Sequence, residues 1–204
     1  MTPHITLAVL LAGGESRRMG NLGDKNLLDW EGTPLWQRQL ATLSALNPER
    51  LEVSAPEQPS WLPEGVSWLG DATANSENIG PISQIRPIGP IGGLLAALES
   101  AGEGLVAALA VDLPSMTTDY LARLQASCFA SMGVVPRGAA GYEPLAAIYP
   151  AGASASAREW IAKGHRDLQG WIDLLVQRGF VSIQEIEASD RPLFRNLNTP
   201  EDLK

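Results

Sequence analysis

The sequence predicts a three-layer α-β-α fold, in which helices cover both faces of a mostly parallel β-sheet. Two largely apolar runs, residues 5–12 and 105–111, are typical of strands that are buried on both faces of such a sheet. Helical patterns alternate with strand patterns along the chain, which is the order of elements in an α/β domain. Since the chain has 204 residues, we expect residues 1–204 to form a single domain.

The remaining elements are expected from capping and turn signals. Thr33 and Pro34 are typical of an N-cap followed by proline at the first helical position, so we expect a helix over residues 34–46. Residues 72–88 are polar and have no clear period, which predicts a mobile surface loop. We expect further strands at 51–54, 66–69, 133–136, 145–149 and 181–186, and further helices at 90–101, from Thr118 onward, at 154–163, at 168–178 and from Thr199 onward.

The composition limits the kinds of partner. The chain carries 15 Lys+Arg and 23 Asp+Glu, a formal net charge of −8, and this acidic balance argues against nucleic-acid binding. The single cysteine, Cys128, excludes an internal disulfide and a multi-cysteine zinc site. The apolar run at 5–12 is shorter than the ~20 residues of a membrane helix, and no basic segment precedes it. We therefore expect a cytoplasmic protein without a nucleic-acid or membrane partner.

A glycine-containing segment with three cations follows the first expected strand. Gly13 and Gly14 would let backbone N–H groups approach a ligand, because no Cβ intervenes. Arg17, Arg18 and Lys25 follow closely in an otherwise acidic chain, and this combination suits a polyphosphate. The spacing matches neither the dinucleotide-binding fingerprint nor the P-loop. The alternative is a plain turn with solvated arginines.

Two aspartates follow expected strands at the same edge of the sheet. Asp112 lies between a strand and Pro114, where a hard oxygen ligand could hold Mg²⁺, because this ion takes one or two carboxylates together with phosphate oxygens. The alternative is a turn or capping aspartate before proline. Asp71 follows the strand expected at 66–69 and could reach the same edge, although taken alone it is better explained as a turn residue.

Together these motifs resemble the signature of the molybdenum cofactor nucleotidyltransferases. The specific block is the first one, residues 11–20 followed by Asp24 and Lys25, and the weaker blocks occur in the family's order over nearly the whole chain. Those later blocks are Gly89-Pro90-Ile91-Gly92-Gly93, Asp112-Leu113-Pro114, Glu143-Pro144-Leu145 and Asn196-Leu197-Asn198-Thr199-Pro200-Glu201-Asp202-Leu203.

The resemblance implies a fold of the nucleotide-diphospho-sugar transferase type and one nucleotidyltransferase domain. It also implies that GMP is transferred from GTP to molybdopterin, with Mg²⁺ as cofactor, so that the guanine dinucleotide cofactor forms and pyrophosphate is released. Guanine is favoured because residues 11–14 are Leu-Ala-Gly-Gly, whereas the cytidylyl-transferring relatives more often have Ala-Ala-Gly. The resemblance also allows transient contact with molybdoenzymes or their chaperones.

By position, the resemblance assigns the guanine and ribose to Leu11, Ala12 and Gly13, with Gly14 in the same nucleotide-binding block. The family's purine-side asparagine falls at Ser54, a departure that weakens this contact.

The phosphate side of the implied site combines cations and carboxylates. Lys25, with Arg17 and Arg18, would act in catalysis by binding phosphates and favouring the departing pyrophosphate. Asp71 would contact the nucleotide, and Asp112 would contact the nucleotide and ligate the metal. The loop that follows Asp71 is longer than in the family.

Two other functions remain open. A different nucleotidyltransferase, which joins CTP or another NTP to molybdopterin or another phosphorylated small molecule, would use the same loop and Asp112. A non-catalytic, nucleotide-gated carrier of the cofactor would bind nucleotide without releasing pyrophosphate. The presence of both Lys25 and Asp112 favours an enzyme.

Other residues are candidates with structural alternatives. Arg166 could bind the pterin phosphate, because a guanidinium group suits phosphate, but a solvated helix start explains it equally well. Cys128 is more consistent with a core position than with a nucleophile. The tryptophans are expected to pack in the core, although Trp36 and Trp171 could edge a pocket.

Overall fold

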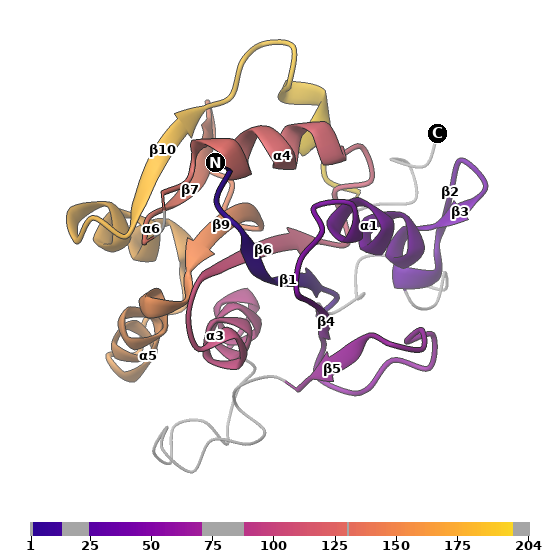
Figure 1. Ribbon diagram of the computed structural model, residues 1–204, viewed down its shortest axis with the longest axis horizontal. Helices are drawn as coiled ribbons and strands as arrows, with labels where there is room; N and C mark the ends of the chain where they lie inside the picture. The colour runs from indigo at the N-terminus through magenta and orange to yellow at the C-terminus, as the bar shows by residue number, and fades with distance from the viewer. Residues whose placement is uncertain (1, 14–24, 71–87, 130, 198–204) are drawn as a thin grey trace.

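An eight-stranded β-sheet forms the middle layer of the structure, a computed structural model that describes residues 2–13, 25–70, 88–129 and 131–197 (Figure 1). Its strands are β1 (Ile5–Leu11), β4 (Arg50–Ser54), β5 (Ser67–Leu69), β6 (Leu105–Ala110), β7 (Gly133–Gly138), β8 (Gly141–Tyr142), β9 (Ala146–Pro150) and β10 (Val181–Glu185). They follow the order β10-β7-β9-β6-β1-β4-β5, and β8 pairs with β7. β9 is antiparallel to β6 and β7, whereas the other neighbours on this path are parallel, which confirms the mostly parallel sheet.

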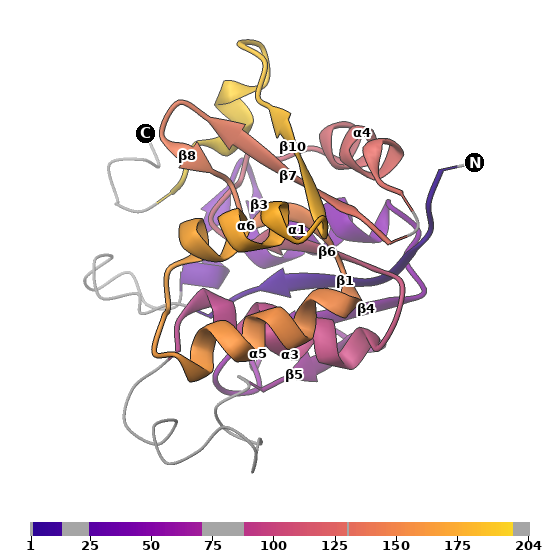
Figure 2. The same ribbon diagram turned by 90° about the vertical axis from the view of Figure 1, so that its left-hand side faces the viewer.

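Helices cover both faces of this sheet (Figure 2). One face carries α1 (Leu35–Ser44) and α4 (Thr118–Ser127), whose apolar residues join one core cluster. The other face carries α3 (Pro90–Ala101), α5 (Ser154–Ala162) and α6 (Leu168–Gln177), whose apolar residues join a second cluster. The expected three-layer arrangement is therefore confirmed.

The central strand β1 shows why both faces need a cover. Leu7 and Val9 pack into the cluster under α3, whereas Ala8 and Leu10 pack into the cluster under α1. All four side chains are fully buried. Alternate side chains of a strand point to opposite faces, so an apolar run of this kind is stable only between two layers of helices.

The helix starts follow ordinary capping chemistry at several places. α4 begins after Thr117, whose hydroxyl oxygen accepts a hydrogen bond from Tyr120 N. α6 begins after Asp167, whose carboxylate accepts from Gly170 N. α3 begins with proline at its first position after Gly89, which has a φ of 77° that a glycine adopts without strain.

The expected helix start at Thr33 and Pro34 is wrong. These residues form β3 (Thr33–Pro34), which pairs with β2 (Asp29–Trp30) in an antiparallel hairpin, and α1 begins at Leu35. The hairpin turns at Glu31 and Gly32, whose φ angles are 54° and 84°. Positive φ at both central residues is what a tight two-residue hairpin turn requires. The turn, and not a helix cap, therefore determines that Thr33 and Pro34 form a strand.

The direction of β9 and the presence of β8 were not predicted. The connection from β7 to β9 is a short hairpin through β8, and a strand joined in this way must pair antiparallel because a parallel partner needs a longer crossover. The other strands and helices lie close to their expected positions. The helix expected from Thr199 lies outside the described residues, as does nearly all of the loop expected at 72–88.

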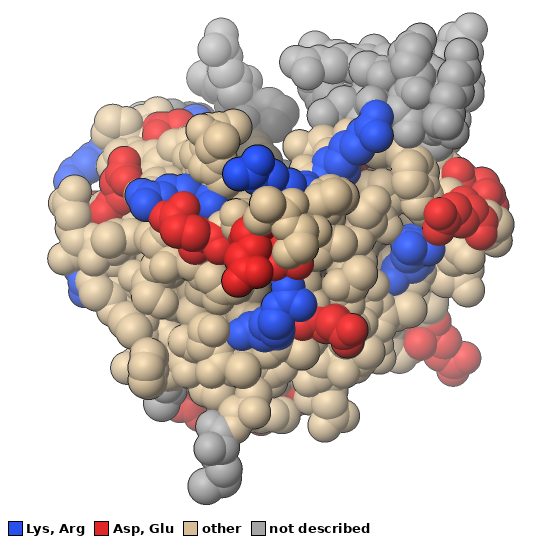
Figure 3. Space-filling view, turned by 90° about the horizontal axis from the view of Figure 1, so that it is seen from above, with Lys and Arg blue, Asp and Glu red and all other residues tan. Residues whose placement is uncertain are grey.

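Charges of both signs are interspersed on the surface shown in Figure 3. Exposed ion pairs elsewhere on the molecule, such as Lys163–Glu159, whose atoms approach to 2.7 Å, also mix the two signs. This face therefore carries no continuous field of one sign. Within the described residues, no helix combines the length and the apolar character that a bilayer crossing demands.

Gly133 is predicted to be required where β7 approaches β9. A Cβ at this position would lie 2.0 Å from the Ile148 carbonyl oxygen, and because that atom is backbone, a strand would have to move. We expect Gly133→Ala to lower the free energy of unfolding by about 2 kcal/mol or more in urea denaturation. The control is Gly138→Ala on the same strand, whose Cβ would meet only Ile186 Cδ1 at 3.5 Å. Equal losses in the two variants would contradict this interpretation.

Candidate active site

The carboxyl ends of β4, β1 and β6 meet at one edge of the sheet. Leu11, the last residue of β1, lies opposite Ser54 on one side and Ala110 on the other. Beyond β1, Ala12 N donates to the Ser54 carbonyl over 2.9 Å. Beyond β6, Val111 N donates to the Leu11 carbonyl over 3.2 Å. The segments that follow β1 and β6 therefore leave the sheet side by side.

An ion pair lies at this edge. Lys25 Nζ is 2.8 Å from Asp112 Oδ2. Lys25 begins the short 3-10 helix η3 (Lys25–Leu27), and Asp112 follows Val111 in the turn after β6. The two side chains keep 18% and 25% of their surface exposed, so a ligand can reach both. The structure thus brings together a cation and a carboxylate that the sequence analysis assigned to one site.

The partial burial of this pair matters for its chemistry. Charges in a partly buried site are screened less by water and salt than charges on an open surface. The Lys25 ammonium group suits phosphate oxygens, and the Asp112 carboxylate suits a divalent cation. A polyphosphate with a bound metal ion offers phosphate oxygens to Lys25 and a cation to Asp112. Its binding can therefore replace the Lys25–Asp112 contact by one contact with each residue.

An open cleft of about 320 Å³ lies beside the end of β1. This volume is within the range of about 300–1,000 Å³ that is typical of small-molecule sites. A Cβ on Gly13 would approach Pro56 Cδ to 3.4 Å, so glycine leaves room next to the cleft wall. Asn26 Nδ2 makes a long hydrogen bond, 3.5 Å, to the Ala12 carbonyl. The cleft is lined by Ala12, Asn26, Ala55, Pro56, Glu57, Gln58 and Pro59.

Aromatic side chains support the segment that forms the cleft wall. Trp36 on α1 stacks on Trp61, with ring centroids 5.1 Å apart and planes inclined by 18°. Trp68 Nε1 donates to the Ala55 carbonyl over 2.9 Å. Trp36 therefore contacts a residue two positions beyond the wall segment 55–59 and does not itself line the cleft, in contrast to the alternative of a pocket-edge position.

The start of α3 lies against the same edge. α3 leads into the amino end of β6, so its own N-terminus, the positive end of the helix dipole, lies at the carboxyl edge of the sheet. Ser54 is 3% exposed, and its Oγ lies where a Cβ on Gly93 would come within 2.6 Å. The Ser54 side chain is therefore packed beneath α3, and the group that it presents toward the end of β1 is its carbonyl.

The donor set at this edge fits a metal ion that phosphate oxygens help to hold. Asp112 supplies one carboxylate, and the described ranges contain no group of three or more His, Cys, Asp or Glu that could hold a metal ion by themselves. Mg²⁺ needs only one or two carboxylates when phosphates complete its shell, whereas a zinc site needs three or four protein ligands. Asp112 beside Lys25 therefore suits a divalent cation of the magnesium type.

Glu143 is a second carboxyl group near the same edge. Ala110 N, at the end of β6, donates over 2.7 Å to the carbonyl of Leu145, two residues after Glu143. Burial raises the pKa of the Glu143 carboxyl above its ordinary value. From the sequence alone, Glu143 stands out only as a member of the Glu143-Pro144-Leu145 block.

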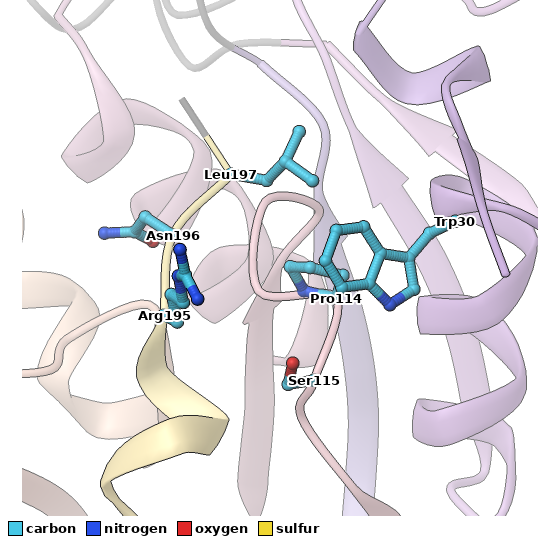
Figure 4. Close-up of a pocket in the computed structure, with 6 residues that line it drawn as sticks. All are labelled: Trp30, Pro114, Ser115, Arg195, Asn196 and Leu197. Atoms are coloured by element: carbon cyan, nitrogen blue, oxygen red, sulfur yellow. The ribbon is translucent and has the colours of Figure 1, made fainter. Parts of the chain in front are cut away.

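The C-terminal segment packs against the turn that carries Asp112. Leu197 is buried, and its N–H donates to the Asp112 carbonyl over 2.9 Å. Figure 4 shows the small pocket at this contact, with Trp30 and Pro114 on one side and Arg195 on the other. No local pattern in the sequence indicates this contact, because the two segments meet only when the sheet has formed.

The structure places some of the predicted site residues and leaves others undescribed. Gly14, Arg17, Arg18 and Asp71 lie outside the described residues, so their roles stay predictions. The residues that come together at the carboxyl edge are Leu11, Ala12, Gly13, Lys25, Ser54 and Asp112.

Three further candidates make structural contacts. Trp171 is fully buried and lies 5.4 Å from the ring of Tyr149, which confirms its packing role. Burial raises the pKa of the Cys128 thiol to about 12, so it is protonated at neutral pH and unsuited to nucleophilic attack. Arg166 Nη1 donates to the Ile161 carbonyl near the end of α5 over 3.0 Å, and its contact with a pterin phosphate stays a prediction.

A parallel-sheet edge that carries a glycine-bearing strand end, a lysine and an aspartate is typical of the nucleotide-binding α/β proteins. Within this class, the chain belongs to the MobA-like NTP transferase family, whose domain matches residues 8–178.

Individual relatives agree with this assignment. A protein of Opitutus terrae named probable molybdenum cofactor guanylyltransferase is 34% identical over 95% of this chain and 90% of its own length. The molybdopterin-guanine dinucleotide biosynthesis protein A of Archaeoglobus fulgidus superposes with a TM-score of 0.70 at 23% identity, covering 97% and 94% of the two chains. The 2-C-methyl-D-erythritol 4-phosphate cytidylyltransferase of Thermus thermophilus gives 0.63 at 18% identity over 96% and 94%. These structures show the nucleotide-diphospho-sugar transferase fold.

Loss of the Trp36–Trp61 stack next to the cleft wall is predicted to weaken nucleotide binding. Trp36→Leu removes the Trp36–Trp61 ring pair while keeping an apolar side chain on α1. Aromatic pairs contribute about 0.5–1.5 kcal/mol beyond burial, which is the largest cost that ordering the wall on binding can add, so we expect the dissociation constant for a nucleoside triphosphate to rise by up to about tenfold. Equilibrium dialysis measures this constant. Trp160→Leu is the control, because Trp160 stacks on His165 at 4.1 Å at the end of α5, and equal weakening in both variants would be evidence against the proposed support.

Proposed function

We propose that this protein transfers GMP from GTP to molybdopterin, so that the guanine dinucleotide cofactor forms and pyrophosphate is released. The proposal takes the whole chain, residues 1–204, as one nucleotidyltransferase domain that works in the cytoplasm with Mg²⁺. It is supported by the family, and by a guanylyltransferase relative that matches over nearly the full length of both chains.

The observation that carries the proposal is the Lys25–Asp112 pair beside the end of β1. A carrier that only binds nucleotide needs no carboxylate next to its phosphate-binding lysine. An enzyme that transfers a nucleotidyl group needs the lysine and a divalent cation that the carboxylate would hold, because negative charge must be offset on the transferring phosphate and on the leaving pyrophosphate.

In the proposed reaction, an oxygen of the molybdopterin terminal phosphate attacks the α-phosphorus of GTP. The new O–P bond forms as the bond from the α-phosphorus to the bridging oxygen breaks, and pyrophosphate leaves with that electron pair. The attacking phosphate is already an anion near neutral pH, so no strong general base is required. The work of the protein is to hold two polyanions together in line and to offset their repulsion.

The site residues divide this work. The cleft beside Ala12 and Gly13 would take the base and ribose, and Lys25 would bind phosphate oxygens on the pyrophosphate side. We assign Arg17 and Arg18 to the same side, and Asp71 to the nucleotide, on the basis of the sequence. Asp112 would hold Mg²⁺, which when bound supplies positive charge to the phosphates.

Transfer from CTP or another NTP is the second candidate function. The Thermus thermophilus cytidylyltransferase shares this fold, so the fold by itself does not select the base. The direct test is pyrophosphate release from each of the four NTPs with Mg²⁺, in the presence and absence of molybdopterin. GTP should be the best substrate, and release should depend on molybdopterin. Nucleotide binding without release would instead support the carrier.

Asp112→Asn is expected to abolish most of the turnover while leaving the fold intact. The substitution keeps the size of the side chain and removes the charge that pairs with Lys25. We expect the rate of pyrophosphate release to fall by about 100-fold or more. The matched control is Asp173→Asn on α6, which replaces the carboxylate that accepts a hydrogen bond from the Tyr142 hydroxyl of β8. A near-normal rate for Asp112→Asn at ordinary Mg²⁺ would reject the metal role.

Gly13→Ala is expected to impair the use of GTP more than the use of CTP. The added methyl group would stand 3.4 Å from Pro56 Cδ, a contact that the wall tolerates, but it narrows the space next to the cleft. A purine fills more of that space than a pyrimidine does. The effect is measured by comparing kcat/KM for GTP and CTP. An equal loss for both nucleotides would contradict the assignment of the base to this end of the cleft.

A further inference from the structure

We propose that Arg38 and Gln39 of α1 are positioning residues, which hold the turn of Asp112 so that its carboxylate can bind the metal ion of the reaction. The inference rests on the proposed function, since it takes Asp112 to be the metal ligand. It comes from the hydrogen bonds made by the backbone of residues 112–114.

Two neighbouring side chains of α1 donate to successive carbonyl groups of this turn. Gln39 Nε2 donates to the Leu113 carbonyl. Arg38 Nε donates to the Pro114 carbonyl over 2.7 Å. Both donors come from one rigid helix that packs on the sheet, so they fix the turn relative to the strands.

The chain beyond α1 holds the turn from other directions. The Asp112 carbonyl accepts from Leu197 N over 2.9 Å, and the Leu113 carbonyl accepts a second bond, from Met116 N, over 3.0 Å. Every carbonyl of residues 112–114 is therefore bonded. Pro114 has no N–H of its own, so its carbonyl is the group through which its backbone can be held by a hydrogen bond.

The position of Gln39 is poorly explained by stability. Its side chain is fully buried, and its Oε1 makes no hydrogen bond within the described part of the chain. Its α1 neighbours Leu35, Leu40 and Leu43 belong to the apolar core. A methionine of similar length could fill the same volume without burying an amide group. What the glutamine adds is a donor directed at the Leu113 carbonyl.

α1 also supports the other member of the ion pair. Leu35 N, at the start of α1, donates over 2.9 Å to the carbonyl of Leu28, directly after η3, which contains Lys25. Arg38 Nη1 lies 3.4 Å from Glu31 Oε2 in the hairpin between these segments. One helix therefore sets the spacing between the lysine and the aspartate.

Metal ligands respond strongly to the groups that orient them. Loss of such a supporting hydrogen bond typically lowers metal affinity or activity about 10–100-fold. Because a displacement of about 1 Å can cost two orders of magnitude in rate, a turn that carries a lone metal-binding carboxylate must be held firmly.

The test uses variants that differ in one donor. Gln39→Met and Arg38→Met each remove the nitrogen that reaches the turn. Arg38→Gln is the rescue variant, because glutamine Nε2 and arginine Nε are both attached to Cδ and can donate from the same place. Gln125→Met is the matched control, since Gln125 Nε2 donates over 2.9 Å to the Pro3 carbonyl at the opposite end of β1.

Metal binding is measured without turnover, with Mn²⁺ as the probe. The EPR signal of free Mn²⁺ is titrated with a GTP analogue that cannot be cleaved between its α- and β-phosphates, with and without the protein, and the Mn²⁺ held by the analogue alone is subtracted. We expect Gln39→Met and Arg38→Met to weaken Mn²⁺ binding about tenfold or more, and Arg38→Gln to restore it. The Mg²⁺ concentration for half-maximal pyrophosphate release should rise by the same factor, with kcat recovered at saturating Mg²⁺. Gln125→Met should leave both measurements unchanged.

The variants also separate this inference from the proposed function. Normal Mn²⁺ binding in Gln39→Met and Arg38→Met, together with loss of binding in Asp112→Asn, would overturn the positioning role and leave the proposed function standing. Retained binding in Asp112→Asn would overturn the metal role of Asp112 and with it the positioning role, whereas GMP transfer itself is tested by pyrophosphate release. Should Gln39→Met fail to fold, the comparison of Arg38→Met with Arg38→Gln decides.

Discussion

The site depends on one half-buried ion pair, in which Lys25 Nζ lies 2.8 Å from Asp112 Oδ2. The strand order β4-β1-β6 makes this contact possible, because it directs the segments that follow parallel strands to one edge of the sheet. A buried charge is costly unless it is paired, so each partner lets the other remain in a partly buried place. In a chain of net charge −8, the pairing with Asp112 holds the Lys25 ammonium group at the edge of the sheet, where it is accessible to a polyphosphate.

α1 links the stability of the fold to the geometry of the site. Its apolar residues pack on the sheet, and its polar residues Arg38 and Gln39 donate to the turn after β6. Trp36, on the same helix, stacks on Trp61, two residues beyond the wall of the cleft. A change that moves α1 therefore acts on the nucleotide side and on the metal side of the site together, although α1 supplies no residue that lines the cleft.

Local patterns predicted most of the elements, because a long apolar run such as β1 is stable only between two covering layers. They failed at Thr33 and Pro34, where a helix cap and a hairpin strand share the same residue types and the Glu31–Gly32 turn decides between them. They did not reveal the direction of β9, which the short connection through β8 imposes. Nor did they show that Ser54 turns its side chain beneath α3, since that depends on the close approach of Gly93.

The sequence by itself determined the fold class, the glycine-containing segment with its cations, and the candidacy of Asp112 and Lys25. These features are local, because apolar periodicity, glycine and charge type act over a few neighbouring residues. The tertiary structure decided that Lys25 and Asp112, which are 87 positions apart, form one ion pair, and that Gln39 and Leu197 hold the aspartate's turn. Such contacts join segments that only the folded sheet brings together, and hydrogen bonds form only at distances and angles that the assembled backbone sets.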